Sequence, residues 1–408
     1  MPDLFNPIDY AVPAFIILIV AEMLWVRRRA PEKYDPRDTL TSLALGTGST
    51  VAGALSGALV FSLAMWIYEN RFFDIGWVWW AWPLCFVLDD LAYYWAHRSG
   101  HRVRWFWASH VNHHSSQHYN LSTALRQTWT GFIALGFIFR IPLAFLGFHP
   151  AMLLFVGAFN LIYQFWIHTE AIYKFPRWVE YIMNTPSHHR VHHATNPRYL
   201  DRNYAGVFII WDRMFGTFVE ERDDEPIAYG IRKPLASYNP VWGNLHAFAE
   251  LLRRSKAAPT LRGALHAWFD SPGGRGNIVP HLDTTRVRRF DTETRPETRR
   301  YALVQYLLLA TMVLHFLVTV QTLSWMLGIG YALVITATTL GIGWALEERP
   351  FAHRFEQARI LATALAFALL PEWFGSELTA GLRVALVGAL LASLAWLPPG
   401  RQPTRPSP

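Results

Sequence analysis

The sequence predicts an all-α protein that crosses a membrane several times and carries a histidine-rich cap at the cytoplasmic ends of its helices. Charged residues make up only 16% of the 408 residues, whereas soluble domains contain roughly 25%. Hydrophobic residues make up 52%, and they gather in long apolar runs. Of the 17 histidines, 12 lie between His97 and His193. These three observations together predict membrane helices that hold one polar, histidine-lined site.

Nine apolar runs are candidate membrane helices, and several approach the ~20 residues that a helix needs to cross the hydrocarbon core. The run at 40–68 is long and rich in glycine, so we expect a tilted or broken helix. The run at 356–371 is short enough to be re-entrant or to lie at the interface. The 19 tryptophans are typical of rings placed at the membrane surface. The runs are 11–26, 40–68, 77–96, 128–147, 150–167, 301–321, 323–345, 356–371 and 379–397.

The basic residues that flank the runs predict the orientation of the chain. Arg27, Arg28, Arg29 and Lys33 follow the first run and should be cytoplasmic. Counting spans onward puts 97–127 and 168–300 on the same side. The predicted parts are N-terminal spans at 1–76, a histidine-box core at 77–218, a cytoplasmic or interfacial segment at 219–300, C-terminal spans at 301–398 and a disordered tail at 399–408.

The polar segment at 219–300 contains one amphipathic stretch. Val241, Leu245, Phe248 and Leu252 share a helical face there, which indicates a helix lying on the membrane surface. The net charge of +7 comes from basic residues placed beside apolar runs. This placement favours a membrane protein over a nucleic-acid-binding protein. The single cysteine, Cys85, excludes an intramolecular disulfide and a cysteine-rich metal site.

The histidines follow a pattern that is typical of metal ligands. They form HRSGH at 97–101, HVNHH at 110–114, HTE from His168 and HHRVHH at 188–193. Residues three or four apart share a helix face and can point at one metal. Adjacent histidines point about 100° apart, which suits two neighbouring metals. Imidazole binds Zn, Cu, Fe and Ni alike, so the ligands leave the metal open. The isolated histidines at 149, 246, 266, 281, 315 and 353 are interpreted as ordinary residues, and His118 could line the site without binding metal.

Carboxylates near the boxes are candidate partners of the ligands. Asp89 and Asp90 lie in an apolar run, where ionisable groups are costly and usually functional. Asp90 shares a face with Tyr94 and His97 but lies two turns from His97, about 10 Å along the axis. We therefore expect Asp90 to orient a ligand histidine from another helix, the alternative being a polar contact between helices. Glu170 is either a partner of a ligand or an interfacial charge.

The three boxes, HxxxH, HxxHH and HxxHH with a further histidine between the last two, resemble the fatty acid hydroxylase/sterol desaturase superfamily of membrane di-iron enzymes. The blocks DLAYYWAHR, HHSSQHYNLSTALRQ, YQFWIHTE, NTPSHHRVHH and NYAGVFIIWDRMFGTF are similar to its ether-lipid-cleaving branch and span about 90–218. The resemblance implies the metal ligands His97, His101, His110, His113, His114, His168, His189, His192 and His193. His188 is an extra member of the last box that either binds metal or holds a neighbouring ligand. Residues implied beside the metal or the substrate are Asp90, Tyr94, Asn120, Glu170, Asn203 and Tyr204.

The same resemblance implies two iron ions, O₂ and a tetrahydropterin as reductant, although no motif indicates a pterin site. The implied activity is a membrane monooxygenase that hydroxylates a lipid C–H bond and cleaves the ether bond of alkylglycerols through a hemiacetal. Its partners would be the lipid substrate, the bilayer and an external electron donor. Alternatives are a hydroxylase or desaturase of a sterol, fatty acyl chain or aminolipid, a histidine-rich metal transporter, and a zinc hydrolase.

Overall fold

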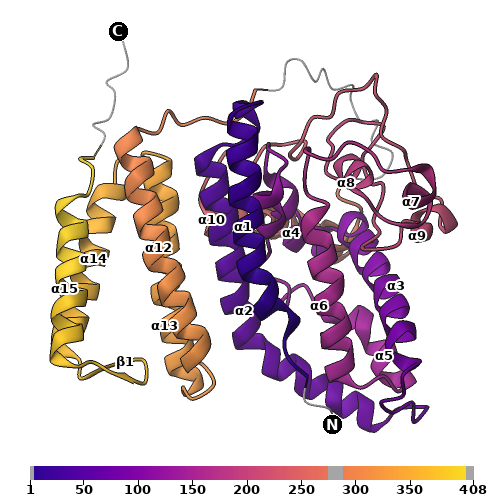
Figure 1. The fold of residues 1–408 in the computed structure, drawn as a ribbon, viewed down its shortest axis with the longest axis horizontal. Coiled ribbons are helices and arrows are strands. Elements are labelled where there is room, and N and C mark those ends of the chain that lie inside the picture. The colour runs from indigo at the N-terminus through magenta and orange to yellow at the C-terminus, as the bar shows by residue number, and fades with distance from the viewer. Residues whose placement is uncertain (1–3, 274–287, 401–408) are drawn as a thin grey trace. The chain divides into compact units, whose positions relative to one another are not determined.

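The computed structural model describes residues 4–273 and 288–400, which are mostly helical (Figure 1). The chain divides into two compact units. Of the described residues, unit 1 comprises 4–35, 56–235, 244–273 and 288–289, and unit 2 comprises 36–55, 236–243 and 290–400. The second helix contributes to both units.

Unit 1 is built on three apolar helices, α1 (Pro7–Arg27), α3 (Ala81–Arg102) and α6 (Pro150–Trp166). α6 packs against both α1 and α3, and the three run side by side in Figure 1. Cys85 of α3 and Met152 of α6 are fully buried in the core that α3 and α6 share. The end of α2 (Pro36–Glu69) adds Ile67 to that core.

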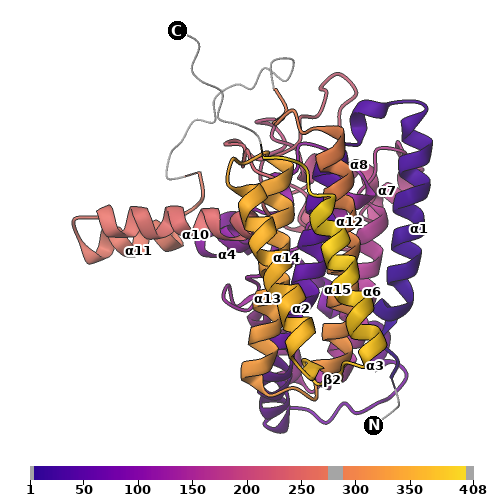
Figure 2. The ribbon, with the colours of Figure 1, turned by 90° about the vertical axis from the view of Figure 1, so that its left-hand side faces the viewer.

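Short helices and turns connect these long helices and surround the ends that carry the histidines. α10 and α11 differ from the rest of unit 1 because they project sideways, across the direction of α1 (Figure 2). The remaining elements are η1 (Pro31–Lys33), α4 (Arg104–His110), η2 (His113–Ser115), η3 (Leu121–Leu125), η4 (Gly136–Arg140), α5 (Ile141–Leu146), α7 (Arg177–Ile182), α8 (Pro186–His192), α9 (Ile210–Met214), α10 (Pro240–Ala257, of which residues 240–243 belong to unit 2) and α11 (Leu261–Phe269).

Unit 2 contains α12 (Pro296–Thr319), α13 (Trp325–Leu346), α14 (Ala352–Leu369), α15 (Ala380–Ala395) and the first part of α2. A short antiparallel hairpin, β1 (Glu372–Trp373) with β2 (Ser376–Glu377), joins α14 to α15. The core of unit 2 contains a buried carboxylate, that of Glu356. Tyr301 donates a hydrogen bond to it at 2.5 Å, and Arg359 forms an ion pair with it. A Cβ on Gly341 would lie 1.8 Å from Glu356 Oε1, so a larger residue there would displace this carboxylate from its present position.

Four helical segments of the described residues are long and apolar enough to cross a membrane: Pro7–Arg27, Pro31–Glu69, Pro296–Thr319 and Trp325–Leu346. Of the two alternatives expected for 40–68, a tilted or a broken helix, the broken one is excluded, since α2 runs without interruption. The predicted span at 128–147 is also wrong. Leu135 adopts a left-handed conformation with φ of 57°, and only η4 and α5 follow it. Residues 401–408 of the predicted disordered tail lie outside the described residues.

Candidate metal centre

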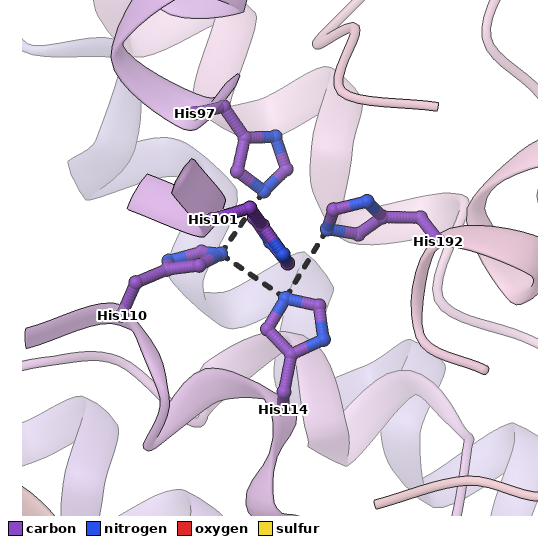
Figure 3. A group of neighbouring side chains, drawn as sticks. All are labelled: His97, His101, His110, His114 and His192. Carbon is purple, nitrogen blue, oxygen red and sulfur yellow. Dashed lines mark hydrogen bonds between the residues drawn. The ribbon is translucent and has the colours of Figure 1, made fainter. Parts of the chain in front are cut away.

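Nine histidines converge in two groups at the ends of α3, α4, α6 and α8. Within each group the candidate ligand atoms lie within 4.8 Å of one another. Figure 3 shows the first group, whose rings turn toward a common centre. The first group consists of His97, His101, His110, His114 and His192, and the second of His113, His168, His189 and His193.

Adjacent histidines serve different groups, as their spacing predicts. His113 and His114 follow one another in η2, yet His113 belongs to the second group and His114 to the first. His192 and His193 at the end of α8 divide in the same way. The two groups share a wall, because His114 stacks on His193 with ring centroids 4.3 Å apart. The chain therefore builds two adjoining sites from one set of boxes.

Backbone carbonyls fix the orientation of four of the rings. His97 Nδ1 lies 2.8 Å from the Tyr204 carbonyl and His192 Nδ1 lies 2.9 Å from that of Arg202. In the second group, Nδ1 of His113 and of His168 contact the carbonyls of Arg126 and Gln164 at 3.2 and 2.7 Å. A carbonyl can only accept a hydrogen bond, so each Nδ1 carries the proton. The Nε2 of each neutral ring is then a bare lone pair directed into its group.

These lone pairs face one another, an arrangement that a bound cation would stabilise. His113 Nε2 and His168 Nε2 lie 3.3 Å apart, and neither has a proton to donate. Burial lowers the pKa of His113 to about 4, so its ring stays neutral near pH 7. Two nitrogens bound to one metal at about 2.1 Å and about 90° would lie roughly 3.0 Å apart. The spacing in the second group therefore fits metal ligation.

The hydrogen-bonding pattern of the first group also fits metal ligation. Nε2 atoms of His97, His110, His114 and His192 form a row with separations of 3.0, 3.1 and 3.2 Å. The two outer nitrogens are bare, so only the two inner nitrogens can supply protons for three contacts. In addition, His101 Nε2 is buried and has no hydrogen-bond partner among the described residues. A bound metal would satisfy every one of these nitrogens. The described residues contribute no carboxylate to either group.

The loop from Asp201 to Tyr204 presents its carbonyls to the first group. Asp201 and Asn203 adopt left-handed conformations with φ of 56° and 53°. The Asn203 side chain bonds the Val219 backbone and the His188 carbonyl, and Tyr204 N donates to Asp212 at 2.8 Å. Tyr204 thus acts through its main chain, while its hydroxyl donates to Asp201 O.

Asp90 contacts no histidine among the described residues, contrary to the expectation from sequence. Its carboxylate accepts hydrogen bonds from Asn160, from the backbone of Val207 and Phe208, and from the Trp211 indole, at 2.8 to 3.0 Å. The side chain leaves α3 two turns before His97 and reaches the loop that follows Tyr204. Asp90 therefore anchors this loop. Its neighbour Asp89 pairs with Arg140.

His188 lies outside both groups. Its Nε2 is 2.9 Å from Glu180 Oε2, and its Nδ1 faces Thr185 Oγ1 at 3.4 Å. Burial raises the pKa of Glu180, but hydrogen bonds from His188 and Ser187 outweigh it and hold that pKa at about 2. His188 thus secures the start of α8 and points away from its neighbours in the box.

The other expected site residues also lie outside both groups. The Tyr94 hydroxyl bonds Thr217 Oγ1 at 2.9 Å, and Asn120 caps η3. Glu170 lies 3.5 Å from Lys33 Nζ and accepts from the Tyr229 hydroxyl at 3.3 Å. These side chains support the elements around the centre.

The chain resembles proteins of known function along most of its length. A family model described as fatty acid hydroxylase matches residues 82–217. The chain is 35% identical to an alkylglycerol monooxygenase of Xenopus tropicalis over 378 residues, covering 88% of this chain and 81% of that protein. It is 35% identical to the Homo sapiens alkylglycerol monooxygenase over 364 residues (86% and 80%), and 34% identical to that of Danio rerio over 391 residues (89% and 85%). The chain belongs to the alkylglycerol monooxygenase family. It is an oxygen-dependent lipid monooxygenase. No solved structure matches it.

The matched region also contains residues that support the histidine groups and that the sequence patterns did not single out. Asp212 holds Tyr204 and Ala205, and Arg126 and Gln164 present their carbonyls to the second group. Asp212 carries the signal that drew attention to Asp90, an acidic residue in an apolar run (FIIWDRMF). The carbonyl acceptors carry no signal, because every residue has a carbonyl.

A polar pocket of about 190 Å³ opens beside the second group of this family member. Glu170 and Lys33 line it, together with Tyr119 and Tyr229. Tyr119 stacks on Tyr229 at 4.9 Å and on His168 at 5.7 Å between ring centroids. Tyr119 therefore contacts both the pocket and the second group.

Proposed function

We propose that each histidine group holds one iron ion and that the pair hydroxylates an ether lipid. The observation that carries this proposal is the facing, unprotonated Nε2 atoms of His113 and His168, which a bound cation would stabilise. Iron is supported by membership of the family rather than by the ligands, since imidazole accepts several metals. When bound, the iron pair would supply the activation of O₂ for C–H hydroxylation.

The chain's own residues would hold and shield the centre. Nine neutral imidazoles carry no negative charge, so they leave the charge of the metals uncompensated. Four backbone carbonyls fix the orientation of the rings, those of Arg126, Gln164, Arg202 and Tyr204. Hydrogen bonds that orient a ligand in this way increase its affinity for the metal. The rings are largely buried, which limits access of bulk water. His188 would support α8 without binding metal.

We propose an alkylglycerol as the substrate, because the similar proteins carry that name. One oxygen atom of O₂ would enter the C–H bond next to the ether oxygen, and the other would leave as water after uptake of two electrons and two protons. The resulting hemiacetal would break its C–O bond and release an aldehyde and a glycerol derivative. The two electrons would come from an external donor, for which the superfamily resemblance suggests a tetrahydropterin.

The centre would lie on the cytoplasmic side of the membrane. The basic residues Arg27, Arg28, Arg29 and Lys33 follow α1, and such residues favour the cytoplasmic side. We further propose residues 77–218 as the catalytic core, flanked by spans at 1–76 and 301–398. Addition of a membrane-impermeant cysteine reagent to oriented vesicles carrying an Arg28→Cys variant would test the side.

The experiment that tests the proposed function is turnover with isotopic oxygen. The chain is purified without oxygen, loaded with iron and given ¹⁸O₂, a tetrahydropterin and a 1-O-alkylglycerol. We expect the released aldehyde to carry ¹⁸O. The aldehyde is reduced at once to the alcohol, so that its oxygen does not exchange with water before the label is measured. His113→Ala should abolish this product, whereas His266→Ala, on the exposed α11, should retain it. Oxidation of a sterol or acyl lipid with the ether left intact would reject the proposed substrate.

A further inference from the structure

α10 and α11 carry apolar stripes that the described part of the chain leaves exposed. On α10, Leu245 and Leu252 lie seven residues apart on one face and are 47% and 49% exposed. On α11, Leu261, Leu265 and Phe269 repeat every four residues and are 78%, 51% and 59% exposed. Such spacing places each set along one side of its helix. We call residues 244–270 the arm.

The arm is fixed to the core of unit 1, so its exposed stripes do not result from a loose helix. Trp105 of α4 packs against Trp268 at 5.3 Å and against Phe248 at 6.3 Å between ring centroids. Arg104 adds a backbone bond to the Asp270 carbonyl at 3.0 Å and a side-chain bond to the His266 carbonyl at 3.1 Å. Phe248, which sequence periodicity placed on the membrane face, belongs to this packed face.

The orientation of the arm suits a membrane surface. Figure 2 shows α10 and α11 lying across the direction of α1, which is long and apolar enough to cross a membrane. A helix set crosswise to a spanning helix lies in the plane of the bilayer. The arm packs on α4, which directly follows α3 and ends at His110. It is therefore held beside the first histidine group.

The charges of the arm complement a lipid surface. It carries four basic residues and two acidic ones. Glu250 bonds both Arg253 and Arg254, and Lys256 and Arg262 lie beside the apolar stripes. Amphipathic helices with basic flanks bind the interface, and anionic headgroups strengthen that binding.

We propose that the arm lies in the interface of the bilayer, with its leucine stripes in the boundary between headgroups and acyl chains. This inference goes beyond the proposed function and does not depend on the metal or the substrate. The arm would then position the protein relative to the membrane surface, a role separate from catalysis. By holding α4 at the depth of the headgroups, the arm keeps His110 and the first group close to the plane where a lipid's polar end lies.

Site-directed spin labelling of the full chain in vesicles tests this placement. Single cysteines replace Leu252 and Leu265 on the stripes and Arg254 on the charged side, and Cys85, which is buried, stays unlabelled. In phosphatidylcholine vesicles containing phosphatidylglycerol, we expect labels at 252 and 265 to relax with O₂ more than with a water-soluble nickel chelate, at a depth of about 5–10 Å. The label at 254 should show the reverse.

Equal access of the nickel chelate to all three labels would overturn the proposal. So would labels at 252 and 265 that are shielded from both reagents in detergent and in vesicles, because another protein surface would then cover the stripes. Monodisperse elution and a thermal unfolding midpoint equal to that of the wild type confirm that each labelled variant is folded. Leu245 and Leu261 provide a second position on each helix if one substitution fails this control.

Discussion

Asp90→Asn should destabilise the protein far more than its small change in shape suggests. The carboxylate accepts four hydrogen bonds, two on each oxygen: Asn160 and Val207 on Oδ1, and Phe208 and Trp211 on Oδ2. An asparagine presents one oxygen and one NH₂ group, so in either orientation its NH₂ faces two buried donors.

Each buried donor left without an acceptor costs about 1–3 kcal/mol, so the substitution should cost roughly 2–6 kcal/mol. This is a large share of the ~5–15 kcal/mol that stabilises a typical folded protein. The free energy of unfolding is measured by denaturant titration in detergent micelles. Asp224→Asn is the matched control, because Asp224 pairs with Arg222 at the surface, where such pairs contribute about 0–1 kcal/mol. Equal unfolding of Asp90→Asn and the wild type would refute the anchoring role.

Two further predictions separate the centre from its surroundings. His113→Ala should lose bound iron, whereas His188→Ala should retain it and lose only stability, as measured by metal analysis and thermal unfolding; loss of iron from both variants would make His188 a ligand. Gly206→Ala should cost about 1–3 kcal/mol by overpacking, because its Cβ would lie 2.7 Å from Asp90 Oδ1. Gly57→Ala, with no atom within 4 Å of the added Cβ, should instead gain up to about 1 kcal/mol of helix propensity. Equal stability of these two alanine variants would contradict the packing described around Asp90.

The division of adjacent histidines between two groups could be predicted because it depends on local spacing. His97 and His101 are one turn apart, and His192 and His193 differ by about 100° around α8. These offsets hold wherever the helices lie. Spacing alone could not show that His188 is not a ligand. His188 lies four residues before His192, so the helix spacing that predicts ligands applies to it as well. Only the position of Glu180, set by α7, shows that His188 turns elsewhere.

The parts that sequence could not predict depend on long-range backbone contacts. Asp90 was expected beside a histidine, but its partners lie near residue 207, in a loop whose path the sequence pattern does not reveal. The run at 128–147 is apolar enough for a span, yet the left-handed Leu135 interrupts it. Hydropathy records the burial of side chains and gives no information on such a turn.

The central claim is that the nine histidines form two adjoining metal sites. Metal analysis of anaerobically purified, iron-loaded protein, combined with X-ray absorption at the iron edge, tests it most directly. We predict two iron ions per chain, each surrounded by imidazole nitrogen and without a protein carboxylate. A single iron ion per chain in the intact, folded protein, or iron bound by carboxylate oxygen, would contradict the account.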